Sequence, residues 1–200
     1  MTRDKRRASP RSSHSASRRT PQKSKSLKSA SAAFTLFKSI LWAPVVRFGS
    51  MNGSLSCRVE QLSTAKPEAI YDVLMDVERW SEFMPTVSAA SWERRGEPHT
   101  AKGGVRRMRI GLSDIRDLIV DGARPHHHAY AASLPWYMRL KDYRGDIRIE
   151  EVPNGSRIVW TVTCESRILP KKSVKSRLEA SYARLAAALA HEAEGITGTE

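Results

Sequence analysis

A carboxyl group placed among apolar residues is the first candidate for chemistry in this sequence. Asp117 alternates with Ile115 and Ile119, so the three side chains share one face of a predicted strand. If that face points inward, burial would raise the pKa of the carboxyl group, which could then act as an acid or base or pair with an arginine. A shift of one residue in the strand register would instead turn Asp117 to solvent.

Three consecutive histidines, His126, His127 and His128, follow the turn at Arg124-Pro125. Alternate strand residues share a face, so His126 and His128 could chelate a metal weakly, but no spaced carboxylate, cysteine or further histidine completes a site. We therefore predict no metal and a solvated strand edge. The alternative is that one of them, with His128 as the candidate, faces a binding site as an acid or base.

Aromatic residues surround Pro135 near a predicted strand end. Tyr130, Trp136 and Tyr137 could cover the entrance to a site or simply anchor a loop, and Tyr130 is a further candidate for proton transfer. The sequence contains no glycine-rich phosphate loop, paired-carboxylate motif or Ser/Cys nucleophile motif. It therefore indicates no particular reaction, and we predict no cofactor.

Positive charge is concentrated near the start of the chain. Residues 1–50 contain 12 Lys or Arg and one acid, whereas residues 51–200 contain 22 Lys or Arg and 20 acids. The net charge of +13 thus belongs mostly to the first segment. A nucleic-acid partner for the folded part is not indicated, because its own charge is nearly balanced.

The sequence divides into a basic segment, 1–50, a domain, 51–195, and a short flexible end, 196–200. Residues 1–31 lack apolar content and are predicted to be disordered. Residues 32–46 are apolar, but Lys38 and Pro44 interrupt them and they are too few for a convincing membrane span. Three interpretations remain open: weak contact of residues 1–47 with a membrane surface, a targeting peptide, or translation from Met51 so that the mature protein lacks this segment.

Only two cysteines occur, Cys57 and Cys164, without a CxxC pair. This usage indicates neither a disulfide framework nor a zinc site, and we predict free thiols in a reduced, cytoplasmic setting.

Hydrophobic periodicity predicts an α+β domain. Pro67 suits a first helical turn, and Ile70, Val73 and Leu74 form one apolar stripe of that helix. A second short helix contains Trp80. Alternation predicts strands over residues 55–62, 87–94, 105–112, 114–121, 127–134, 143–152 and 157–164, with Leu112 inward and a hairpin turn at 153–155. A long amphipathic helix follows over about 172–193, and Gly195 is its predicted end.

Several segments in this order carry a resemblance to a known family. They are Pro67-Glu-Ala-Ile-Tyr-Asp-Val-Leu74, Asp76-Val-Glu-Arg-Trp80, Gly104 before an Arg-rich strand, Arg124-Pro125 before an aromatic strand, Tyr143-Arg-Gly145, and Asn154-Gly-Ser-Arg-Ile-Val-Trp160 before the last helix. Over about residues 55–193 the chain resembles the polyketide cyclase/dehydrase and lipid-transport branch of the START-like (SRPBCC) superfamily. The resemblance implies a helix-grip fold, in which a curved antiparallel sheet of six or seven strands wraps around a long C-terminal helix. It also implies a cavity for lipids, polyketides or isoprenoids, without a shared catalytic motif.

The predicted register places eight side chains between the sheet and the last helix, where they either fill the core or contact a ligand. They are Met108, Ile110, Ile147, Ile149, Trp160, Leu178, Tyr182 and Leu185. Trp160 and Tyr182 are the strongest candidates for contact, because each joins a broad apolar face to one polar group.

Three functions are compatible with this sequence. The first is binding or transport of a small hydrophobic ligand. The second is a polyketide cyclase, aromatase or dehydratase in which Asp117, a histidine or a tyrosine moves protons. The third is a membrane-associated quinone or lipid chaperone with residues 1–47 as its anchor.

Overall fold

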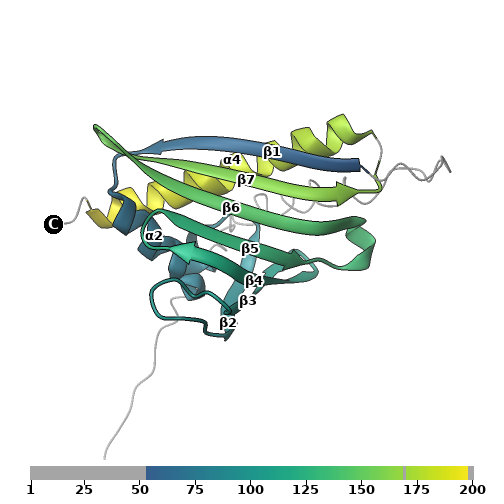
Figure 1. The fold of residues 1–200 in the computed structure, drawn as a ribbon, viewed down its shortest axis with the longest axis horizontal. Coiled ribbons are helices and arrows are strands. Elements are labelled where there is room, and N and C mark those ends of the chain that lie inside the picture. The colour runs from purple at the N-terminus through teal and green to yellow at the C-terminus, as the bar shows by residue number, and fades with distance from the viewer. Residues whose placement is uncertain (1–52, 169, 198–200) are drawn as a thin grey trace, which may run out of the picture.

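Seven antiparallel strands form one sheet in the computed structural model, which describes residues 53–168 and 170–197. The sheet order is β1-β7-β6-β5-β4-β3-β2 (Figure 1). The strands are β1 (Gly53–Ser63), β2 (Val87–Arg94), β3 (Val105–Ile110), β4 (Ser113–Ala123), β5 (His127–Ser133), β6 (Leu140–Val152) and β7 (Gly155–Ser166). The predicted α+β class and the helix-grip arrangement are confirmed.

Short helices follow the first strand, and one long helix closes the chain. They are α2 (Pro67–Met75), η1 (Val77–Arg79), α3 (Trp80–Phe83), η2 (Trp136–Met138) and α4 (Lys171–Thr197). Pro67 opens α2, where its missing N–H costs nothing. Gly195 does not end α4 as predicted: it has no positive φ, so it forms no left-handed cap, and the helix continues to Thr197.

Helix α4 packs against β1 and β7 at one side of the sheet and also contacts α2 and α3. Figure 1 shows α2 near the C-terminal end of α4. Its buried residues recur every few positions: Val174, Tyr182, Ala186, Leu189, Ala190 and Ala193. The hydrophobic core therefore lies between this helix and the inner sheet face.

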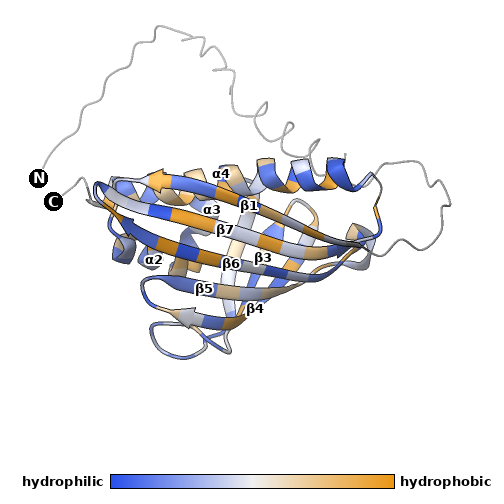
Figure 2. Cartoon of the chain, turned by 45° about the horizontal axis from the view of Figure 1, so that its top comes forward, coloured by the Kyte–Doolittle hydropathy of each residue, from blue (hydrophilic) through white to orange (hydrophobic). Residues whose placement is uncertain are grey.

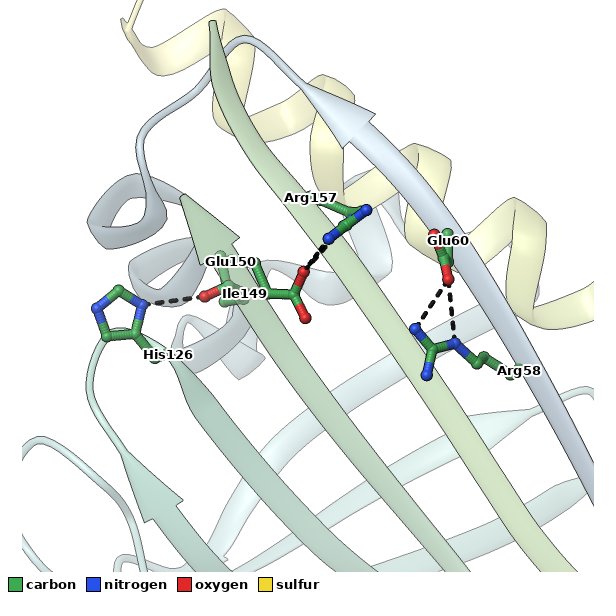
Figure 3. Close-up of polar contacts among 6 residues, drawn as sticks. All are labelled: Arg58, Glu60, His126, Ile149, Glu150 and Arg157. Atoms are coloured by element: carbon green, nitrogen blue, oxygen red, sulfur yellow. Dashed lines mark hydrogen bonds and ion pairs between the residues drawn. The ribbon is translucent and has the colours of Figure 1, made fainter. Parts of the chain in front are cut away.

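The outer sheet face is polar. Hydrophilic and hydrophobic bands alternate along β1, β7 and β6 (Figure 2), as expected where one face is solvated. Ion pairs such as Arg58–Glu60 and Arg157–Glu150 lie on these strands (Figure 3). In the part of the chain that the structure describes, no helix is long and apolar enough to cross a membrane.

The prediction that Leu112 points inward is wrong. Ile110 pairs with Ser113, so Gly111 and Leu112 form a two-residue hairpin loop between β3 and β4. Gly111 has a φ of +60°, a conformation that favours glycine. Leu112 consequently lies at the hairpin tip and is 88% exposed.

Both cysteines are free and buried, in agreement with the prediction of free thiols. They lie on the adjacent strands β1 and β7, where Cys57 pairs with Val162 and Cys164 with Leu55. Burial raises the pKa of both thiols, that of Cys164 to about 11, so neither is an activated nucleophile near neutral pH.

Candidate functional site

A cavity of about 160 Å³ lies between α4 and strands β2–β7. An apolar protein cavity of about 150 Å³ is large enough to hold benzene, so this space suits one small ring system. Most of its walls are apolar, from residues such as Met84, Val87, Met108, Ile110, Ile115, Leu134, Met138, Leu178 and Leu185. Exposed Thr86, Arg177 and Arg184 belong to its lining and mark its opening.

Six of the eight residues predicted to contact a ligand line this cavity: Met108, Ile110, Trp160, Leu178, Tyr182 and Leu185. Ile147 and Ile149 do not. They are 0% and 1% exposed and lie farther along β6, in the part of that strand that α2 contacts. They share the inward face but fill the core, because a helix already covers that end of the sheet.

A buried ion pair forms one polar part of the lining. Arg106 on β3 lies directly opposite Asp117 on β4, and its Nε donates to the Asp117 Oδ2 at 3.0 Å. The two side chains are only 1% and 3% exposed. Asp117 therefore points inward on the face shared with Ile115 and Ile119, and its partner is an arginine.

Aromatic rings enclose the Arg106 guanidinium. Its Cζ lies 4.5 Å from the centre of the Trp80 ring and 4.7 Å from that of Tyr130. Such contacts stabilise a cation that has left water. Burial raises the pKa of Asp117 and the Arg106 charge opposes that shift. The Arg106 guanidinium is therefore a positive charge at the cavity wall whose counter-charge is the Asp117 carboxylate.

The predicted solvated position of His128 is wrong. Strand β5 is paired on both sides, with Gly122 and Ile147 opposite His128, so it is not an edge strand. His128 itself is 0% exposed. Arg106 Nη1 lies 3.4 Å from His128 Nε2. Because arginine only donates, Nε2 accepts and the proton of the neutral ring is on Nδ1.

His128 is expected to make the protein less stable in acid. Burial, with the charges of Arg106 and His127, lowers its pKa well below 6.5. The unfolded chain takes up a proton near pH 6.5 and the folded protein does not, so stability is lost as pH falls below that value, by up to about 1.4 kcal/mol per pH unit. Urea titrations of His128→Leu should show a flatter profile, whereas exposed His126→Leu should keep the slope. Equal slopes in His128→Leu and wild type would contradict this assignment.

Three tyrosine hydroxyls and one indole form a hydrogen-bonded chain at the cavity. Trp160 Nε1 donates to Tyr130 Oη at 3.2 Å, and Tyr182 Oη lies 3.3 Å from Tyr130 Oη and 2.7 Å from Tyr143 Oη. All four residues line the cavity. Each of the two hydroxyl–hydroxyl contacts uses one proton. Since the three tyrosines carry three hydroxyl protons, one O–H is left to donate to another acceptor.

Burial keeps this chain neutral. It raises the pKa of Tyr130 to about 12 and those of Tyr143 and Tyr182 well above 10. The hydroxyls therefore serve as hydrogen-bond donors near neutral pH rather than as bases. Gly145 makes room for the chain, since a Cβ there would overlap the Tyr130 ring.

The remaining predicted residues lie outside the cavity. His126 is exposed, with its Nδ1 3.0 Å from the Ile149 carbonyl oxygen (Figure 3), and His127 Nε2 lies 2.7 Å from Asp146 Oδ2. Within the described ranges, no cluster of three His, Cys, Asp or Glu residues is arranged to hold a metal. Tyr137 anchors its loop through a 2.7 Å contact with Ser113 Oγ, and Trp136 is 88% exposed.

Arg106 is the main residue that the sequence reasoning missed. It alternates with Met108 and Ile110 along β3, so the same alternation could have identified it as an inward residue, and the structure places it opposite Asp117. Tyr143 was likewise assigned to a strand without a role. The sequence predicts Trp80 in a short helix, and only the tertiary fold brings its ring against Arg106.

A curved antiparallel sheet that grips a long C-terminal helix around a cavity defines a START-like domain. A family model described as polyketide cyclase / dehydrase and lipid transport matches residues 54–194. The chain belongs to this family.

Solved structures with this fold share little sequence with the chain. A Staphylococcus aureus protein of unknown function has a TM-score of 0.59 at 12% identity, over 74% of this chain and 98% of its own. The di-domain ARO/CYC StfQ from the steffimycin biosynthetic pathway has a TM-score of 0.59 at 15% identity, over 72% of this chain and 52% of its own. A START superfamily protein from Mycobacterium smegmatis has a TM-score of 0.56 at 15% identity, over 72% of this chain and 98% of its own. These likenesses show the fold alone, and no curated protein matches the sequence significantly.

Proposed function

We propose that this protein binds a small, mainly apolar molecule that carries one hydrogen-bond acceptor. The observation that carries the proposal is a cavity with apolar walls whose lining also includes Arg106 and the three hydrogen-bonded tyrosines. Apolar burial would supply most of the affinity, and the polar groups would orient a carbonyl or similar oxygen. A lipid, polyketide or isoprenoid fragment has this chemistry.

Native mass spectrometry of the purified protein tests the proposal directly. A co-purified molecule, released by denaturation and identified by its mass, would establish the ligand class. In parallel, fluorescence titration with 2-naphthol tests a bicyclic probe that joins an apolar body to one oxygen. Absence of both a bound molecule and saturable probe binding would contradict the proposal.

Filling the cavity should abolish binding without unfolding the domain. Ala132 lines the cavity and is half-buried, so Ala132→Phe places a ring in the space that a ligand needs. We expect at least a tenfold loss of 2-naphthol affinity and a loss of about 1–3 kcal/mol in the free energy of unfolding, which leaves the domain folded. Ala183→Phe, on the exposed side of α4, is the matched control and should bind normally. Unchanged affinity in Ala132→Phe would place the probe elsewhere.

A second candidate function, polyketide cyclisation or dehydration, is favoured by the ionic and phenolic groups in the same cavity. Arg106 could stabilise an enolate oxygen, and the surplus tyrosine O–H could protonate it. Product analysis separates the two functions, because a cyclase would convert a polyketide-like substrate whereas a carrier would release it unchanged.

A further inference from the structure

One end of the sheet joins the cavity opening to several exposed loops. Ser113 Oγ contacts Tyr137 Oη at 2.7 Å, which ties the β3–β4 hairpin to the β5–β6 connection. The Arg167 N–H donates to the Arg139 carbonyl at 3.2 Å and adds the β7–α4 connection. Strand β1 begins here as well, because Gly53 pairs with Ser166. In Figure 1 this is the end at which β7 finishes and α4 starts.

The two most exposed large apolar side chains of the described residues lie at this end. Leu112 and Trp136 are each 88% exposed. Their loops also line the cavity, through Ile110 before the first and Leu134 and Met138 around the second. Single exposed apolar residues need no explanation, but this pair borders an apolar cavity.

Positive charge gathers at the same end. Residues 134–142 and 165–184 contain eight Lys or Arg and three acids, whereas the rest of residues 51–200 contains 14 Lys or Arg and 17 acids. The exposed basic side chains include Arg139, Lys141, Arg167 and Lys172. We call these four, with Leu112 and Trp136, the rim surface. Residues 1–50, with 12 Lys or Arg, precede β1 in the sequence and lie outside the described residues.

We propose that the rim surface docks on an anionic lipid membrane, with the cavity opening toward the bilayer. Lys and Arg are attracted to anionic headgroups, while Trp and Leu insert at the headgroup level. A nucleic acid would account for the charge but not for the paired apolar side chains. Docking extends the proposed function, since an apolar ligand could pass directly between bilayer and cavity, but it does not require ligand binding.

Co-sedimentation of the full chain with lipid vesicles tests the docking. We expect binding to phosphatidylcholine vesicles that contain phosphatidylserine, little binding to pure phosphatidylcholine, and weakening by salt. Leu112→Ser/Trp136→Ser should lower the partition coefficient about tenfold. Leu62→Ser is the matched control, because Leu62 is 65% exposed near the far end of β1 and should bind like wild type. Arg139→Glu/Lys141→Glu should also weaken binding, unlike Arg58→Glu/Arg148→Glu on the outer sheet face.

Wild-type partitioning of the Leu112/Trp136 variant would overturn the proposal, because residues 1–50 would then account for binding. Lack of binding to the anionic vesicles would overturn it too. The 2-naphthol titration keeps the two proposals distinguishable. The Leu112/Trp136 variant should keep its probe affinity, and Ala132→Phe should keep its vesicle binding, so either proposal can fail while the other stands.

Discussion

The Arg106→Met variant is expected to lose about 3–5 kcal/mol of unfolding free energy relative to wild type. Removal of the guanidinium leaves Asp117, which is 2% exposed, without its counter-charge and without the hydrogen bond to Arg106 Nε. The contacts with the Trp80 and Tyr130 rings are lost as well. Equilibrium urea unfolding at neutral pH, followed by circular dichroism, measures the difference.

Two further variants isolate the buried charge as the cause. Arg107 is the next residue of β3 but faces solvent, with a side chain 46% exposed, so Arg107→Met should change stability by less than about 1 kcal/mol. The double variant Arg106→Met/Asp117→Leu should recover most of the loss, because it removes both charges together. If Arg106→Met proved no more costly than Arg107→Met, the ion pair would not be an important element of the cavity wall.

The Gly145→Ala variant should be the second most damaging, with a loss of about 3 kcal/mol. A Cβ at position 145 would overlap the Tyr130 ring, which must then move away from β6. Movement of Tyr130 disrupts its contacts with Trp160 Nε1 and Tyr182 Oη, and each lost hydrogen bond costs about 1 kcal/mol. Urea unfolding gives the stability, and 2-naphthol titration shows whether the displaced ring occupies the cavity.

Gly195→Ala is the matched control for Gly145→Ala, because the same substitution should stabilise the protein at position 195. Gly195 is helical, and a Cβ there meets no atom within 4 Å. Alanine favours a helix over glycine by about 1 kcal/mol, so this variant should be slightly more stable than wild type. Similar effects of the two substitutions would show that crowding of Tyr130 is not what makes glycine necessary at position 145.

Strand parity predicted much of the fold, but side-chain alternation does not say where a strand ends or what covers it. The spacing predicted that Asp117 shares a face with Ile115 and Ile119, and the structure shows that this face points inward. Leu112 continued the same alternation beyond the end of β3, where a hairpin turns the chain over. Ile147 has the correct parity for the cavity, but the end of β6 on which it lies packs against α2.

The sequence alone determined the α+β class, the order of the strands along the chain, the long closing helix and the inward faces of most strands. These features follow from local periodicity, turn residues and helix propensity, which neighbouring residues encode. Only the tertiary structure decided which inward side chains meet: Arg106 with Asp117, Trp80 and Tyr130 around the guanidinium, and Tyr182 with Tyr143. Strand curvature and the path of α4 set those distances, because they arise from packing between segments far apart in the chain.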